Sequence, residues 1–192
     1  MRIIGGDFKG LRLSVVGSGQ PSAHLRPTSD RVRESIFNLL INGGYGDPVR
    51  GALVLDLFAG TGALGLEALS RGAKNVVFVD DGKVAAGLIR KNIELCHMQD
   101  RVTLLRHNAL TFKNHADRSF DLVFLDPPYG KNMGQVALTV LQGCGALAAG
   151  SLAVWEENSQ QSAPIGFDML DVRRYGGTWV HILSLTNSDR DN

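Results

Sequence analysis

Apolar and polar positions follow two rhythms along most of this chain. Beyond Gly51, short runs rich in Val, Leu and Phe alternate with longer stretches whose apolar residues recur every three or four positions. The short runs predict buried strands, and the three-to-four spacing predicts amphipathic helices. This alternation is typical of an α/β domain with a mostly parallel sheet. We expect strands at 52–57, 75–80, 101–106, 120–125 and 151–156, and helices at 63–71, 83–96 and 133–147.

The C-terminal part departs from this rhythm. Residues 167–175 and 178–185 predict two strands joined by Gly176 and Gly177, and such a glycine pair is typical of a tight hairpin. Together with the preceding strands, they predict a seven-stranded, mostly parallel sheet with an antiparallel C-terminal strand.

The N-terminal part carries its own pattern. Residues 2–16 predict a short β-hairpin, and residues 17–27 predict a loop rich in Gly, Ser and Pro. A helix at 30–40 follows, because Thr28 or Ser29 can cap it and its apolar residues fall on one face.

Length and composition narrow the classes of protein. The 192 residues, 44% of them hydrophobic, suit one globular domain rather than two. We expect an N-terminal extension at 1–50, a main domain at 51–186 and a disordered tail at 187–192. No apolar run approaches the roughly 18 residues of a membrane span and no signal-peptide pattern opens the sequence, so we expect a cytoplasmic protein. Cys96 and Cys144 lie outside any metal-ligand spacing, so we expect no metal site.

Charge is unevenly distributed, although the net charge is only +1. Residues 1–50 hold seven Arg or Lys against four Asp or Glu, whereas the remainder is slightly acidic. A polyanion is therefore expected to meet the N-terminal part. Arg26, Arg31 and Arg33 are expected to project there from the loop and the first turns of the helix.

A glycine loop follows the first predicted strand. Gly60, Gly62 and Gly65 form a G-x-G-x-x-G pattern, which lets a ligand approach main-chain N–H groups at a helix N-terminus. Nicotinamide and flavin enzymes share this spacing. Asp56, at the end of the strand, favours S-adenosylmethionine, because a carboxylate attracts its ammonium and sulfonium groups but repels the pyrophosphate of a dinucleotide.

Further candidate ligand contacts come at the ends of the next two strands. Asp80 ends the second strand, where an acid can accept hydrogen bonds from ribose hydroxyls, and the Asn108 amide after the third strand can hold an adenine. The expected donor site consists of Asp56, Phe58, Gly60, Thr61, Gly62, Asp80, Asn108 and Ala109.

The fourth strand ends in Asp-Pro-Pro-Tyr at 126–129. Prolines lock φ and lack N–H donors, so the Asp126 carboxylate and the Pro127 carbonyl can converge as acceptors. Such a pair can hold both hydrogens of a nucleobase amine and direct the nitrogen lone pair at a methyl group. Tyr129 is expected to stack on the target base. The expected catalytic residues are Asp126, Pro127 and Tyr129.

These motifs together resemble the Rossmann-like class I methyltransferases, and most closely the RsmD family, which methylates guanine N2 in 16S ribosomal RNA. The resemblance covers nearly the whole chain, and its most specific part is the Arg-Pro-Thr segment that generic methyltransferases lack. The matching segments are 2–6, 26–38, the glycine loop with 67–72, and 126–129.

The resemblance implies a function for the basic extension. It implies that S-adenosylmethionine is the methyl donor and that the N-terminal region helps to engage RNA through Arg26, Thr28, Arg31 and Arg33. It also implies 16S ribosomal RNA as the partner, within a small-subunit particle, and a monomeric enzyme.

Three other functions stay open on the residues alone. A DNA adenine-N6 methyltransferase uses the same amine chemistry. A nicotinamide-dependent oxidoreductase uses the same glycine spacing. A non-catalytic RNA-binding assembly factor can retain the fold without the reaction.

Overall fold

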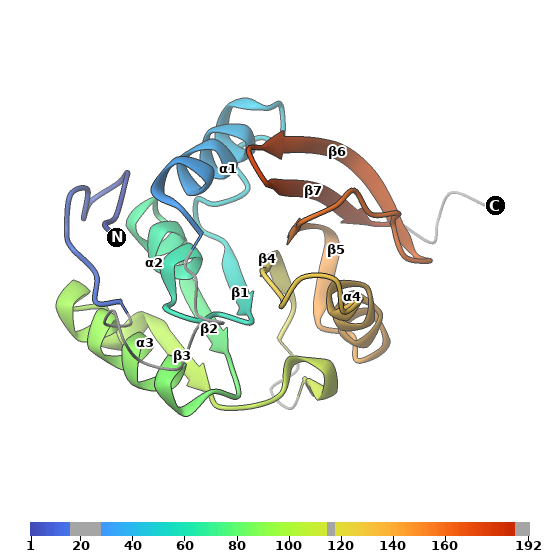
Figure 1. The fold of residues 1–192 in the computed structure, drawn as a ribbon. Helices are drawn as coiled ribbons and strands as arrows, with labels where there is room; N and C mark the ends of the chain where they lie inside the picture. The colour runs from blue at the N-terminus through green and yellow to red at the C-terminus, as the bar shows by residue number, and fades with distance from the viewer. Residues whose placement is uncertain (16–27, 115–117, 187–192) are drawn as a thin grey trace.

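The computed structural model describes residues 1–15, 28–114 and 118–186. They contain one seven-stranded sheet of order β3-β2-β1-β4-β5-β7-β6 (Figure 1). Only β7 runs against its neighbours, pairing antiparallel with both β5 and β6, so the predicted mixed sheet is confirmed. The strands are β1 Leu53–Leu57, β2 Asn75–Val79, β3 Val102–Leu105, β4 Phe120–Leu125, β5 Leu147–Glu157, β6 Phe167–Tyr175 and β7 Thr178–Leu185.

Helices cover both faces of this sheet. Successive strand residues point to opposite faces, so Val54 packs in one apolar cluster and Leu55 in the other. The first cluster includes side chains of α1, α2 and α3, and the second includes those of α4 and the short helix η2. The helices are α1 Asp30–Asn42, α2 Ala63–Ser70, α3 Lys83–Cys96, η1 Gln99–Arg101, η2 Ala109–Thr111 and α4 Met133–Gly143.

The largest differences from the predicted boundaries lie between α4 and β5, whereas the other elements differ by at most two residues at an end. Helix α4 ends at Gly143 rather than at 147, because Gly145 adopts a left-handed φ of 63° that ends the helical path. Strand β5 consequently starts at Leu147, before a bulge opposite β4. At α1, Ser29 is the cap, and its side chain accepts a hydrogen bond from the Val32 N–H.

The N-terminal segment is a hairpin in connectivity but has no strands among residues 1–15. A single antiparallel bridge joins Arg2 and Arg12. The segment packs on α2, where the buried Glu67 carboxylate accepts hydrogen bonds from the Ile4 and Gly5 N–H groups, each at 2.8 Å. Ile3, Leu13 and residues of α1 share an apolar cluster with the sheet, so the described parts of the N-terminal region pack into the main core.

None of the helices in the described ranges has both the length and the apolar character that crossing a bilayer demands.

Candidate active site

The glycine loop lies between β1 and α2, at the carboxyl edge of the sheet. Gly60 and Gly62 adopt left-handed φ angles of 57° and 77°, and Gly62 is the N-cap residue of α2. Phe58 is also left-handed, with φ 58°, a conformation that costs a non-glycine residue about 1–2 kcal/mol. The loop therefore needs its glycines for backbone shape, as the spacing predicts.

The third glycine of the pattern has a packing function. A Cβ at Gly65 would lie 2.4 Å from Cε1 of Phe78 on β2. Because α2 packs this tightly on the sheet, its N-terminal N–H groups are held beside β1. Gly65 thus helps to position the glycine loop through the packing of α2 on the sheet.

The carboxylates of Asp80 and Asp56 accept hydrogen bonds from the main chain of the glycine loop and of the residues next to it. Asp80 Oδ2 accepts a hydrogen bond from the Gly60 N–H at 2.9 Å, and Asp80 Oδ1 accepts one from Gly82 at 2.8 Å. Asp56 Oδ2 accepts one from the Gly65 N–H at 2.9 Å. Within the described residues, Asp56 Oδ1 has no hydrogen-bond partner, so one oxygen of this carboxylate stays available to a ligand.

The other expected donor residues lie around the same loop. Thr61 is buried, and its carbonyl accepts a hydrogen bond from the Asn92 amide of α3, so Thr61 contributes to the position of the loop. Asn108 caps η2, since its Oδ1 accepts from the Leu110 N–H. Its amide nitrogen forms no hydrogen bond within the described residues, and Ala109, the next residue, is buried.

The Asp-Pro-Pro-Tyr motif extends from β4 at the same edge. Asp126 is half-buried, Pro127 is buried, and Tyr129 is 40% exposed. Burial raises the pKa of Tyr129, and the neighbouring carboxylates of Asp126 and Glu156 raise it further. The Tyr129 ring is thus accessible and its hydroxyl stays protonated.

A threonine bridges two carboxyl groups beside the motif. Thr28 Oγ1 lies 3.1 Å from Asp126 Oδ2 and 3.0 Å from Glu156 Oε1. A hydroxyl has one hydrogen, so only one of these bonds can be donated by Thr28, and the other needs a protonated carboxyl.

The pKa shifts indicate which carboxyl keeps its proton. Burial raises the pKa of Glu156 well above its usual value, and the Asp126 charge raises it further. Burial also raises the pKa of Asp126, to about 7, while the Thr28 hydrogen bond lowers it. These directions favour a protonated Glu156 that donates to Thr28, in which case Thr28 donates to the Asp126 carboxylate. This chain leaves Asp126 Oδ1 to accept a hydrogen from a guest.

Several carboxyl groups gather at this edge and raise one another's pKa values. Burial is the largest cause of the raised pKa of Asp56, and the charges of Asp126 and Asp80 add to it. Glu157 is also buried, raises the pKa of Asp126, and accepts a hydrogen bond from the Gly130 N–H at 3.3 Å. Mutual repulsion of buried carboxylates favours a cationic ligand between them.

Glu156 and Glu157 were missed in the sequence, although a signal was present. Both acids end an apolar run at 151–157, as Asp56 and Asp80 end theirs. Acids at the carboxyl end of several strands of one parallel sheet meet at one edge. The contact of Thr28 with Glu156 and Asp126 depends on the path of the N-terminal extension, which the pattern of β5 does not reveal.

The expectation that Arg33 projects toward RNA is wrong. Its side chain is 0% exposed, and its Nε lies 3.6 Å from the buried Glu67 carboxylate. It also donates to Asp30 Oδ1 at 2.9 Å and to the Thr28 carbonyl at 3.2 Å. Arg33 is buried because the buried Glu67 carboxylate needs a cationic partner. Its hydrogen bonds to Thr28 and Asp30 also hold the start of α1 in place.

The remaining residues of the expected RNA-binding set lie in different places. Arg31 is exposed on α1. Thr28 belongs to the carboxyl cluster rather than to an exposed basic surface. Arg26 lies outside the described residues, as do the whole of the predicted loop at 17–27 and the predicted tail at 187–192.

This strand order, with a glycine loop after β1 and Asp-Pro-Pro-Tyr after β4, defines a class I methyltransferase. Residues 1–184 match the family model described as Conserved hypothetical protein 95. The chain belongs to this family, and the resemblance to RsmD is confirmed by relatives named Ribosomal RNA small subunit methyltransferase D.

Two of these relatives and one solved structure illustrate the similarity. The chain is 38% identical to the methyltransferase D of Haemophilus influenzae, over 73% of this chain and 70% of the relative. It is 34% identical to that of Escherichia coli, over 85% of this chain and 78% of the relative. The structure of Escherichia coli yhhF superposes with a TM-score of 0.81 at 29% identity, covering 96% of this chain and 97% of yhhF.

Proposed function

We propose that this protein transfers a methyl group from S-adenosylmethionine to the exocyclic N2 amine of a guanine in 16S ribosomal RNA. The observation that carries the proposal is the Thr28-bridged Asp126 carboxylate, which lies at the same sheet edge as the glycine loop. The names of the relatives support a small-subunit ribosomal RNA substrate over DNA or a nicotinamide reaction.

The donor side fits S-adenosylmethionine in charge and shape. Its ammonium and sulfonium groups are cations, and the carboxyl groups of Asp56, Asp126 and Glu156 at this edge raise one another's pKa values, so a cation between them is favoured. Asp56 would hold the ammonium group, Asp80 the ribose hydroxyls and Asn108 the adenine, against the main chain of Gly60 and Gly62. When bound, S-adenosylmethionine supplies an electrophilic methyl group on a positively charged sulfur.

The acceptor side orients and activates a base amine. A nucleobase amine is a poor nucleophile, because its lone pair is delocalised into the ring. Asp126 Oδ1 and the Pro127 carbonyl would accept its two hydrogens, so the nitrogen can pyramidalise toward the methyl carbon. Tyr129, exposed beyond the prolines, would stack on the base once it has left its helix.

The same carboxylate is suited to take up the proton. Methylation gives the nitrogen a positive charge, which is lost with one of its hydrogens. Asp126 has a pKa of about 7, so it is largely ionised just above neutrality and can accept that proton. Glu156 would act through Thr28 as a positioning residue, because it holds the Thr28 hydrogen on Asp126 Oδ2.

The setting of the reaction follows from its substrate. The protein would act in the cytoplasm on a small-subunit particle, where its ribosomal RNA substrate is found. It would act as a monomer, because one chain supplies both the donor side and the acceptor side. Arg31 and Arg26 are assigned to the RNA, in keeping with the basic excess of residues 1–50.

The test uses tritiated-methyl S-adenosylmethionine with unmodified small ribosomal subunits and, separately, with duplex DNA. We expect label in the subunits only, and mass spectrometry of the nucleosides should identify N2-methylguanosine. Asp126→Ala should lower the rate about 10²–10³-fold with donor binding retained. Asp81→Ala, an exposed neighbouring acid, serves as control. Label in N6-methyladenosine, or full activity of Asp126→Ala, would refute the proposal.

A further inference from the structure

A surface cavity of about 510 Å³ lies between the start of α1 and the β6–β7 turn. Ser29 and Arg31 line it from α1, and Arg174, Gly176 and Thr178 line it from the hairpin. Figure 1 shows the arrowhead of β6 reaching α1 at this place. Its volume is within the range of pockets that hold small molecules or single nucleotides.

This cavity adjoins the acceptor side. Trp179 at the start of β7 pairs with Glu157 at the end of β5, so the hairpin turn lies at the carboxyl edge of the sheet. Thr178 lies close enough to Tyr129 to lower the pKa of its hydroxyl through a hydrogen bond. On the other wall, Ser29 directly follows Thr28, which contacts Asp126. When a base of an RNA strand enters the acceptor site, the adjoining part of that RNA strand would therefore lie next to this cavity.

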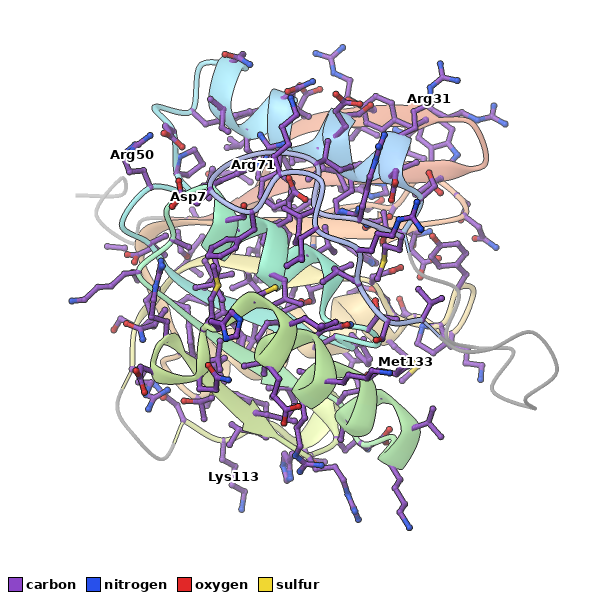
Figure 2. All side chains as sticks on the ribbon, turned by 90° about the vertical axis from the view of Figure 1, so that its left-hand side faces the viewer. Asp7, Arg31, Arg50, Arg71, Lys113 and Met133 are labelled. Atoms are coloured by element: carbon purple, nitrogen blue, oxygen red, sulfur yellow. The ribbon has the colours of Figure 1, made fainter. Side chains whose placement is uncertain are left out.

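The cavity is lined by two arginines whose charge is not neutralised by the residues around them. Arg31 and Arg174 are both exposed, and neither forms an ion pair with any residue in the described ranges. Figure 2 shows Arg31 projecting away from the body of the molecule. The neighbouring Arg173, in contrast, is paired with Asp171 at 3.0 Å.

Arg174 is also held in position. Its guanidinium lies 5.6 Å from the centre of the Trp179 ring, directly across the strand pair. Its Nε donates to the Gly176 carbonyl at 3.1 Å, which leaves the terminal nitrogens as donors. A guanidinium fixed by an aromatic face and one hydrogen bond is pre-organised for a phosphate.

We infer that this cavity binds the RNA backbone next to the target nucleotide, with Arg31 and Arg174 contacting phosphates from opposite walls. The inference rests on the proposed function and extends it to the β6–β7 hairpin. The N-terminal end of α1 adds a partial positive charge on the same side. A polyanion is the partner that fits, because both guanidiniums lack a carboxylate in the described structure.

The experiment measures binding of a small-subunit RNA fragment to the donor-saturated protein at several salt concentrations. Arg174→Ala should weaken binding about three- to tenfold and make the slope of log K against log salt shallower by about 0.7–1. Arg31→Ala should do the same, and the double variant should lose about twice as much slope. Arg173→Ala is the matched control, one residue away and already ion-paired, and should leave the slope unchanged.

Methyl transfer separates failure of this inference from failure of the proposed function. The KM for RNA should rise in Arg174→Ala while kcat and the affinity for S-adenosylmethionine stay at the wild-type level. If the wild-type protein labels the RNA but Arg174→Ala shows an unchanged KM and salt slope, the inference is overturned. If the wild-type protein labels no RNA, the proposed function fails, and the inference fails with it. A thermal melt of each variant checks that these exposed substitutions preserve folding.

Discussion

The donor side and the acceptor side lie at one sheet edge, yet they are built from different materials. On the donor side, main-chain N–H groups of Gly60, Gly65 and Gly82 are paired with the Asp80 and Asp56 carboxylates. On the acceptor side, side chains far apart in the sequence are joined by two hydrogen bonds, from Thr28 to Asp126 and between Thr28 and Glu156.

This difference shows what determines the geometry of each side. The donor side depends on local backbone geometry, which is set once the chain has folded. The acceptor side adds hydrogen bonds between side chains whose direction depends on which carboxyl group is protonated, so its geometry changes with pH. Predictions for the donor side therefore concern affinity and stability, and those for the acceptor side concern pH dependence.

The largest effect is expected from removing the carboxylate that holds the donor loop. Asp80→Ala deletes the acceptor for Gly60 and Gly82 and the proposed partner of the ribose. We expect the affinity for S-adenosylmethionine to fall about 10–100-fold by titration calorimetry, because hydrogen bonds to charged groups are worth about 1.5–3 kcal/mol. Asp81→Ala, its exposed neighbour, should bind normally. Equal affinities of the two variants would show that the loop is held by other contacts.

Next in size is the packing of α2 on the sheet. Gly65→Ala places a methyl group 2.4 Å from Cε1 of Phe78, so the free energy of unfolding should fall by about 1–3 kcal/mol in urea denaturation. Gly87→Ala on α3 is the control, since its Cβ meets nothing within 4 Å and should stabilise the helix slightly. A Gly65→Ala protein as stable as the wild type would mean that α2 can move away from β2.

On the acceptor side, Thr28→Val should change the pH–rate profile. The Thr28 hydrogen bond lowers the pKa of Asp126, and the reaction uses the ionised carboxylate. Loss of the Thr28 hydrogen bond should move the acidic limb of the kcat profile to higher pH. The rate at pH 7 should fall by about three- to tenfold, which corresponds to the free energy of about one hydrogen bond. Thr28→Ser keeps the hydroxyl and should restore the profile. An unshifted limb in Thr28→Val would remove Thr28 from the mechanism.

The smallest effect concerns stability against pH. Because the folded pKa of Glu156 is raised, its contribution to stability is complete at low pH and is lost as pH rises through that pKa. Glu156→Gln cannot ionise and can still donate to Thr28. Its Tm at pH 9 should therefore exceed that of the wild type by about 2–4 °C, with little difference at pH 5. Glu94→Gln on the exposed face of α3 is the control. A constant Tm difference across pH would contradict a protonated Glu156.

Much of the fold and of the donor side was predictable, because both depend on local sequence. The glycine spacing, the acid at the end of β2 and the alternation of strands and helices each act within a few residues, and the structure contains them. The acceptor side was predictable only at the Asp-Pro-Pro-Tyr motif, 126–129. The Thr28 bridge spans 98 residues to Asp126 and 128 to Glu156, and no local pattern encodes such a pairing. Burial of Arg33 was equally hidden, since its partner Glu67 is on another helix.

The buried Glu67 has a mechanical consequence. Its carboxylate joins the main chain at Ile4 and Gly5 to Arg33 of α1 and to Arg71 just after α2. The N-terminal segment is consequently no flexible arm that searches for a substrate, but part of the frame that carries the donor loop at the far end of α2. A substitution at Glu67 is therefore expected to loosen the N-terminal segment, the start of α1 and the frame of the glycine loop together.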